Sequence, residues 1–489
     1  INNGNIVVSG EAYGMVINSG DNDHSAVNSS TGTITVSNGG TGFYLGHNLT
    51  VSSIEMKNEG TIQADGEGSK GVVLEGEVTY NKGKNVATFE NSGTIAAING
   101  AQAVSINAGT FKFSMSGESN IDGTFNIADD ATVSLSANGV TDEFTLEASK
   151  LEALELSDGA NLTLSAGQSK DLSIKDVTIS KDSSVSFTDD RNIEITASAT
   201  GVGNFKNEGN FSAKTLTVTK ENNSFSNSGT IDVGTLDLSG SANDKSAIGG
   251  IIKASDRITY RGIAGNLLTR KLDAILYTPL LQIQSDHTNW SGFLVTSNDV
   301  LANVQNIEIT SAALTQGSTR TGLTFEGDDI VVNSNIAFKG DGSDARIEIK
   351  NGSNVTLSNV SSTAAGSKIQ INGSATATVD SISVDQGAAL SLQVNGSTEG
   401  DNAVFSLSQI SVADGGAFRA SVYDDKQPDI TIQGDIDIRL GENSIVDFGG
   451  QKNPDWRDQK IHIESSSINI AVSDSDNAGT VYLSKSGTD

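Results

Sequence analysis

Four pairs of neighbouring acidic residues have a type and spacing that could do chemistry. Two carboxylates that flank a sugar chain on one face of a sheet are the usual means of cleaving a polysaccharide. The pairs are Asp129-Asp130, Asp189-Asp190, Asp328-Asp329 and Asp424-Asp425. Each lies beside a predicted turn, where aspartate is favoured because its side chain bonds the local backbone. We therefore interpret them as turn residues and predict no catalytic residue.

Histidines and possible calcium loops are equally uninformative. The sequence holds four histidines, at positions 24, 47, 287 and 462, and none lies in a recognisable triad motif. Residues 474–479 resemble half of a calcium-binding loop, but Ala478 replaces a ligand and Lys485 stands where the twelfth-position glutamate belongs. Residues 340–344 are similarly incomplete. We predict neither a metal site nor a cofactor.

Rare aromatic residues are the better candidates for binding. Phe, Trp and Tyr make up 5% of the chain, so an exposed ring would stand out as a recognition anchor. Trp290 is the preferred candidate because it lies near a histidine in a segment that breaks the repeat. The full set of candidate binding residues is Trp290, His287, Tyr277, Phe43, Tyr44 and Trp456.

A seven-residue motif recurs along the chain and indicates how these residues are positioned. It consists of a large apolar residue, any residue, Asn, Ser or Glu, Gly, Thr or Asn, and Ile or Phe. Its asparagines are Asn58, Asn91, Asn207 and Asn227. The motif joins a strand end, a tight corner and a new strand start, and internal repetition of this kind is typical of a solenoid. We predict that the asparagines are structural and stack from coil to coil through their side-chain amides.

Composition supports a wound sheet. Short stretches such as residues 33–36 and 161–164 alternate apolar and polar residues, as strands with one buried face do. The chain has only 3 prolines among 489 residues, as expected where nearly every strand pairs on both edges. With no cysteine it can form no disulfide, and a formal net charge of −29 disfavours nucleic acid as a partner.

One segment interrupts the pattern. Residues Leu268, Leu272, Ile275 and Leu276 have the spacing of a helical face, and Thr278-Pro279 would end that helix. We expect a small helical or hairpin excursion near residues 257–295, with one irregular coil and a capping helix as the alternative. The expected organisation is therefore 1–255 and 301–489 as the two parts of a β-helix, with 256–300 as an irregular segment packed on it.

The asparagine-glycine motif and the acidic, cysteine-free, Ser/Thr/Asn/Gly-rich coils resemble the passenger domains of bacterial autotransporter (type V secreted) adhesins, chiefly the AIDA-like, self-associating class. The resemblance covers essentially the whole chain and implies an all-β, right-handed parallel β-helix. It also implies export to the bacterial cell surface by a C-terminal membrane barrel, whose strand pattern this sequence does not show. The Gly-Asp-Ser-Gly segment of the family's proteases is absent. At roughly 21 residues per coil, the chain would form about 20 coils and extend about 100 Å.

These observations lead us to expect a non-enzymatic cell-surface adhesin. Its partner would be a host cell-surface protein or glycan, or another copy of itself, with a role in virulence or bacterial aggregation. The alternative is a secreted β-helical polysaccharide lyase or hydrolase, which would need acidic and basic residues aligned on adjacent coils.

Overall fold

The computed structural model describes residues 1–18, 23–81, 86–196, 203–218, 224–239, 248–262, 268–285, 291–311, 321–340, 345–396, 401–422, 429–448, 461–472 and 477–482. The chain divides into two compact units. The first consists of Ile1–Leu236 with Asn243–Ala247, and the second of Asp237–Ala242 with Ile248–Asp489. Each unit is described by itself.

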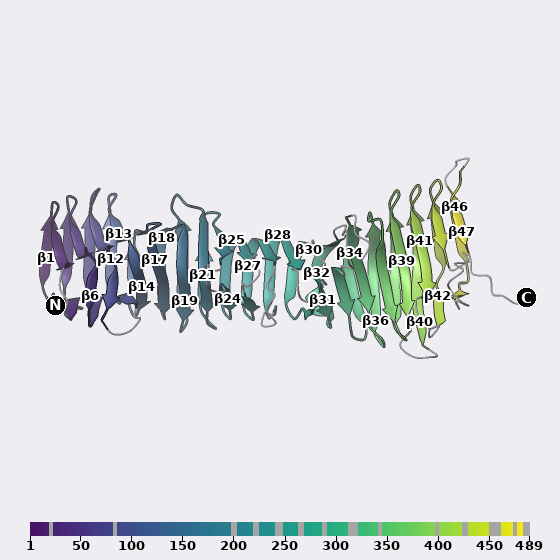
Figure 1. The fold of residues 1–489 in the computed structure, drawn as a ribbon, viewed down its shortest axis with the longest axis horizontal. Coiled ribbons are helices and arrows are strands. Elements are labelled where there is room, and N and C mark those ends of the chain that lie inside the picture. The colour runs from purple at the N-terminus through teal and green to yellow at the C-terminus, as the bar shows by residue number, and fades with distance from the viewer. Residues whose placement is uncertain are drawn as a thin grey trace, which may run out of the picture. The chain divides into compact units, whose positions relative to one another are not determined.

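The described chain is a parallel β-solenoid of about 15 turns, with 70% of residues in strands and 1% in helix. Neighbouring strands come from successive coils and pair in parallel, often without a shift in register. Figure 1 shows these strands stacked within each unit. The prediction of an all-β parallel β-helix is thus confirmed.

The first unit begins with coils that carry three sets of strands. One set forms a five-stranded sheet of β1 (Asn5–Ser9), β4 (Thr33–Ser37), β8 (Thr61–Asp65), β12 (Thr94–Ile98) and β15 (Asn120–Asp122). A small two-stranded sheet joins β6 (Leu49–Val51) and β10 (Val78–Tyr80). The other strands are β2 (Tyr13–Ile17), β3 (His24–Asn28), β5 (Thr41–Leu45), β7 (Ile54–Asn58), β9 (Lys70–Leu74), β11 (Ala87–Asn91), β13 (Gln102–Ile106), β14 (Gly109–Ser116), β16 (Thr124–Ile127), β17 (Ala131–Asn138), β18 (Thr141–Glu147), β19 (Lys150–Ser157), β20 (Asn161–Ala166), β21 (Asp171–Ile179), β22 (Ser184–Phe187), β23 (Asn192–Ile195), β24 (Asn204–Asn207), β25 (Asn210–Val218), β26 (Ser224–Asn227) and β27 (Thr230–Ser239).

Coil length changes within this unit. Stacked corner asparagines are 30 residues apart from Asn28 to Asn58 and 33 from Asn58 to Asn91, but only 20 from Asn207 to Asn227. The predicted length of about 21 residues therefore fits the later coils and is wrong for the first ones, which contain an extra sheet. For this reason the chain forms fewer coils than predicted.

Apolar side chains fill the inside of the coils. Buried phenylalanines stack along the first unit, with ring centroids 5.1 Å apart for Phe43 and Phe89, 5.3 Å for Phe89 and Phe113, and 4.8 Å for Phe113 and Phe125. Burial of large aromatic side chains at this density is a major source of stability. The interior is thus a continuous apolar stack within the unit.

Each coil of the second unit combines one long strand, or two short ones, with a strand of a separate nine-stranded sheet. The first set is β28 (Ile251–Gly262), β30 (Ile275–Ser285), β32 (Asn303–Ser311), β34 (Ile330–Lys339), β36 (Asn354–Ser362), β38 (Thr376–Val384), β40 (Asn402–Val412), β42 (Asp429–Gln433), β43 (Ile436–Leu440), β45 (Ile461–Glu464) and β46 (Ile468–Val472). The nine-stranded sheet contains β29 (Leu268–Lys271), β31 (Ser291–Val295), β33 (Thr321–Phe325), β35 (Ala345–Ile349), β37 (Ser367–Asn372), β39 (Ala389–Asn395), β41 (Ala417–Val422), β44 (Ile445–Asp447) and β47 (Thr480–Tyr482).

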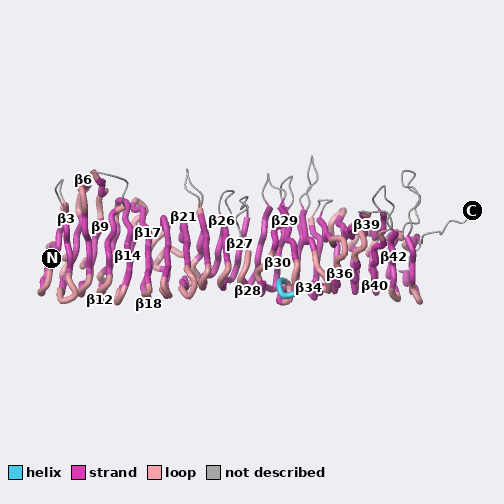
Figure 2. Tube along the Cα trace, turned by 90° about the horizontal axis from the view of Figure 1, so that it is seen from below, coloured by secondary structure: helices cyan, strands magenta, loops and turns pink. Residues whose placement is uncertain are grey.

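The only helical turn among the described residues is η1 (Asn298–Val300), the cyan turn in Figure 2, which contacts β30 and β34. Ser297 caps it by accepting a hydrogen bond from the Asp299 backbone N–H. No helix in the described ranges is long and apolar enough to cross a membrane.

The helix expected around Leu268–Leu276 is wrong. Leu268–Lys271 forms β29 and Ile275–Ser285 forms β30, while Thr278 and Pro279 lie inside β30. The error has a physical reason: a spacing of four residues, as from Leu272 to Leu276, fits the two-residue period of a strand as well as a helical turn. Leu272, Ala274 and Leu276 are all buried, which is the strand pattern.

Candidate functional site

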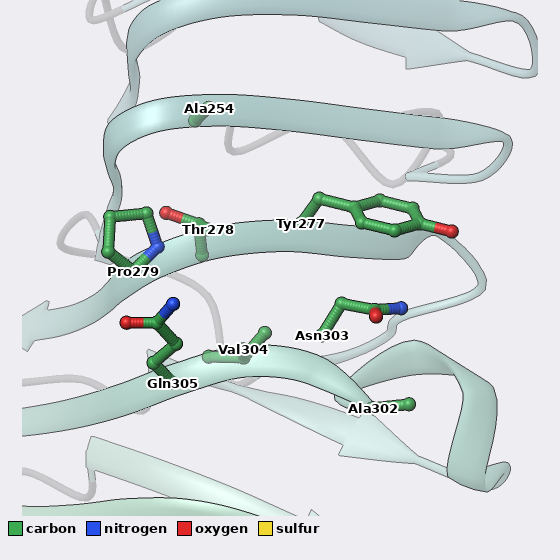
Figure 3. Close-up of a pocket in the computed structure, with 8 residues that line it drawn as sticks. All are labelled: Ala254, Tyr277, Thr278, Pro279, Ala302, Asn303, Val304 and Gln305. Carbon is green, nitrogen blue, oxygen red and sulfur yellow. The ribbon is translucent and has the colours of Figure 1, made fainter.

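An open pocket of about 400 Å³ lies on the outside of the second unit, where β28, β30 and β32 stack. Figure 3 shows its wall, with Tyr277 and Asn303 extending in the same direction from adjacent strands. Its lining residues are Ala254, Tyr277, Thr278, Pro279, Ala302, Asn303, Val304 and Gln305.

The pocket forms where the strand ladder is irregular. Between β28 and β30, the register shifts between Lys253, which pairs with Tyr277, and Ile258, which pairs with Leu281. Pro279 lies in this gap and has no N–H to donate to a neighbouring strand. A proline combined with an extra residue in the adjacent strand bends the sheet, and this bend hollows the surface.

The polar groups at the pocket remain available to a ligand. Tyr277 is 42% exposed, and Asn303 and Gln305 are exposed as well. Within the described ranges, no hydrogen bond joins the side chain of Tyr277, Asn303 or Gln305 to another protein group. An aromatic ring with two unengaged amides is therefore presented to solvent.

A ladder of side-chain amides begins beside the pocket. The amide of Asn306 donates to the Pro279 carbonyl at 3.1 Å and accepts from Asn335 at 3.1 Å. Asn335 in turn accepts from Asn359 at 2.9 Å, and Asn359 accepts from the Ser381 hydroxyl at 2.6 Å. These residues occupy one register column on β32, β34, β36 and β38. We call the column Asn306–Asn335–Asn359–Ser381 the outer amide ladder.

A charged pair lies next to this ladder. Glu308 accepts hydrogen bonds from Gln282 at 3.0 Å and from Lys339. Burial alone would raise the pKa of Glu308, but these hydrogen bonds and the Lys339 charge outweigh burial and lower it. The carboxylate is therefore ionised and engaged, which makes it a poor general acid.

Sequence reasoning missed an aligned polar network on the nine-stranded sheet. Arg346 donates to Gln370 at 2.8 Å, and Gln370 donates to Asn372 at 2.9 Å. Asn372 donates to Glu348 at 2.7 Å, and Lys350 forms an ion pair with Glu348 at 3.3 Å. The available signal was the alternation of polar residues in Arg346-Ile347-Glu348-Ile349-Lys350, repeated 22 residues later from Lys368 to Asn372.

This network has the acidic and basic residues that a β-helical enzyme would need, yet its geometry is that of a structural element. Arg346, Glu348 and Gln370 are each less than 10% exposed. The Glu348 carboxylate is held by Asn372 and Lys350. A buried charge that is paired and hydrogen-bonded is satisfied within the fold.

The other candidate binding residues differ in their surroundings. Phe43 is fully buried and packs at 88° against Phe89, so it offers no surface to a ligand and its proposed binding role is corrected. Tyr44 is half-buried and stacks on Tyr13 at 4.3 Å. Its hydroxyl donates to Glu75 at 2.6 Å, and this bond, with burial, raises the pKa of Tyr44 to about 12. His287, Trp290 and Trp456 lie outside the described residues.

The acidic pairs lie in turns where the structure describes them. Asp189, Asp190 and Asp329 adopt positive φ values of 58°, 61° and 56°, a conformation that aspartate tolerates in turns. Asp424-Asp425, residues 341–344 and residues 474–476 lie outside the described ranges. Within those ranges, no three or more His, Cys, Asp or Glu side chains are grouped to hold a metal ion.

The corner asparagines form the predicted amide stack. Asn58, Asn91, Asn207 and Asn227 are buried, and Asn207 donates to Asn227 at 2.8 Å. The stack in the first coils is longer than predicted, since Asn2 donates to Asn28 and Asn28 to Asn58, each at 2.8 Å.

Comparison with known proteins gives no assignment. No protein-family model, no curated protein and no solved structure matches this chain. Function must therefore be argued from the site and the fold alone.

Proposed function

We propose that the protein is a non-enzymatic adhesin of the bacterial cell surface, similar to an autotransporter passenger domain. The observation that carries this proposal is the open pocket at Tyr277 with the outer amide ladder beside it. Together they present hydrogen-bonding groups at regular intervals on the outside of a solenoid. Such a surface suits binding to a host protein or glycan, or to a second copy, since each hydrogen bond contributes only about 1 kcal/mol and many are needed.

The chemistry of the pocket favours binding over catalysis. None of its eight lining residues is ionisable at neutral pH apart from the weakly acidic Tyr277 phenol. Hydrolysis or elimination on a sugar requires a general acid and a base, commonly two carboxylates. The carboxylates of Glu308 and Glu348, described above, are engaged by lysines and amides.

An adhesion assay tests the proposal. Beads coated with the purified protein should adhere to host cell monolayers or aggregate with one another, whereas albumin-coated beads should do neither. Absence of both behaviours would contradict an adhesin. Incubation with a panel of polysaccharides tests the enzymatic alternative, because new reducing ends or unsaturated uronate products would show cleavage.

A further inference from the structure

We propose that the pocket at Tyr277 is a binding site for a neutral oligosaccharide, whose chain continues along the outer amide ladder. This inference rests on the proposed adhesin function and names the class of ligand. All residues involved belong to the second unit.

The exposed ring is the first reason. Tyr277 is nearly half exposed within a strand of a chain that has few aromatic residues. A tyrosine ring offers a large, rigid apolar face with a polar end, and the C–H face of a pyranose ring is its natural complement. Pro279 and Ala254 extend the apolar part of the pocket beside it.

The free amides are the second reason. Asn303 is the register partner of Tyr277 on the next strand, and Gln305 lines the same pocket. Each amide offers two N–H donors and a carbonyl acceptor, which can bond the vicinal hydroxyls of a sugar. Since Asn303 and Gln305 have no hydrogen-bond partner among the described residues, binding would not break existing bonds.

The charge of the surroundings selects a neutral ligand. The pocket lining has no cation, and the chain carries a formal charge of −29, which repels polyanions. Lys253, the register partner of Tyr277 on β28, is the nearest cation in the strand ladder. At the outer amide ladder, the charge of Lys339 is neutralised by Glu308.

The direction of the ladder fits an extended sugar chain. Successive coils lie about 4.8 Å apart, and the ladder presents one side-chain amide or hydroxyl on each of four consecutive strands. An oligosaccharide that leaves the pocket across the strands would meet a polar group at every coil. The Asn306 amide, bonded to the Pro279 carbonyl, links the pocket to the ladder.

Binding to immobilised cellohexaose, maltohexaose, chitohexaose and a polygalacturonate hexamer tests the inference. At least one neutral hexamer should bind the wild-type protein in preference to polygalacturonate. Tyr277→Ala should weaken that binding about tenfold or more, and Asn303→Ala should weaken it as well. Tyr277→Phe, which keeps the ring, should stay within about threefold. Tyr13→Ala is the matched control, because Tyr13 is 51% exposed and lies in the first unit.

Three results would overturn the inference: no neutral hexamer binds, polygalacturonate alone binds, or Tyr277→Ala binds as well as Tyr13→Ala. Circular dichroism should show that each variant keeps its strand content, and binding of an Asn303→Ala variant that stays folded provides an independent reading. If the hexamers fail while coated beads still adhere to cells, the oligosaccharide assignment is wrong and the adhesin proposal stands. If the beads fail as well, both are wrong.

Discussion

The side-chain amide of Asn58 donates a 2.8 Å hydrogen bond to the amide oxygen of Asn91, one coil further along. Asn58 also accepts from Asn28 at 2.8 Å, so each amide is donor to one coil and acceptor from another. The Ser119 hydroxyl ends this stack by accepting from Asn91. In the next coils the same register column is apolar, with Met115, Ala137, Leu156 and Ile179, before Asn207 and Asn227 resume it.

Replacing Asn58 by leucine should destabilise the surrounding coils by about 3 kcal/mol. Although an apolar residue is native to this column four times, it follows apolar neighbours there, whereas Asn58→Leu leaves the donor of Asn28 and the acceptor of Asn91 buried without partners. A buried unsatisfied polar group costs about 1–3 kcal/mol. Urea unfolding and hydrogen exchange of peptides from residues 54–98 measure the change.

Asn161→Ala is the control for that substitution. Asn161 is exposed and accepts one hydrogen bond from Ser184, so its loss should change stability by less than about 0.5 kcal/mol. Equal effects of the two substitutions would show that the buried amide stack contributes no more than a surface contact.

The glycine of the corner motif is required for space and not for its conformational freedom. A Cβ atom on Gly93 would lie 2.1 Å from the Gly60 carbonyl oxygen, although Gly93 has no positive φ. Gly93→Ala should therefore separate the coils and lower stability by about 3 kcal/mol. Gly4→Ala should be neutral, because no atom lies within 4 Å of that position. A thermal midpoint of Gly93→Ala equal to that of Gly4→Ala would contradict the steric explanation.

The repeated corner motif was sufficient to predict the fold, because it encodes both a turn and a buried amide. It could have revealed more, since Asn2-Asn3-Gly4-Asn5-Ile6 also fits the motif. Asn28 escaped because two additional residues separate it from Gly32. Coil length was not predictable from the motif alone, since an inserted strand between two corners leaves the corners unchanged.

The candidate site was only partly predictable. Rarity of aromatic residues singled out Tyr277, but it singled out the buried Phe43 equally, since a sequence does not show which side of a two-residue alternation faces the interior. Asn303 was not identifiable, because its role comes from register with Tyr277 across 26 residues of chain. Such pairings depend on coil length, which the irregular corners obscure.

A buried arginine ties three coils of the first unit together. The Arg191 guanidinium donates to the carbonyls of Leu146 at 2.6 Å, Ala148 at 2.7 Å and Ser165 at 3.4 Å. Its burial lowers the pKa of Arg191, while the nearby Glu147 raises it. Arg191→Met should cost about 3 kcal/mol in urea unfolding, because it leaves buried carbonyl groups without donors.

Arg191→Lys should recover only part of that loss, since an ammonium group lacks the planar fork that reaches several carbonyls at once. Arg257→Met serves as control, because Arg257 is exposed and its ion pair with Asp256 joins adjacent residues. Full recovery by lysine would show that charge alone, and not the shape of the guanidinium, stabilises this corner.

Asp142 makes the stability of the first unit dependent on pH. Its carboxylate is buried and accepts hydrogen bonds from the backbone N–H groups of Ile121 and Glu143, both at 2.9 Å. Ile121 lies in β15, the last strand of the five-stranded sheet, so Asp142 covers the free edge of that sheet. Burial raises the pKa of Asp142 from 3.8 to about 6, against the lowering effect of the two hydrogen bonds.

Because the folded-state pKa is the higher one, the folded protein binds the proton more tightly than the unfolded chain does. The resulting stabilisation is complete below about pH 4, declines as pH rises through about 6, and is absent above that value. A shift of this size corresponds to about 3 kcal/mol. Asp142→Asn should remove that part of the difference in unfolding free energy between pH 4 and pH 7, whereas Glu143→Gln, at an exposed neighbour, should leave it unchanged. Both variants are compared with the wild type by urea unfolding at each pH. A pH dependence that survives in Asp142→Asn would assign it to other carboxylates of this acidic chain.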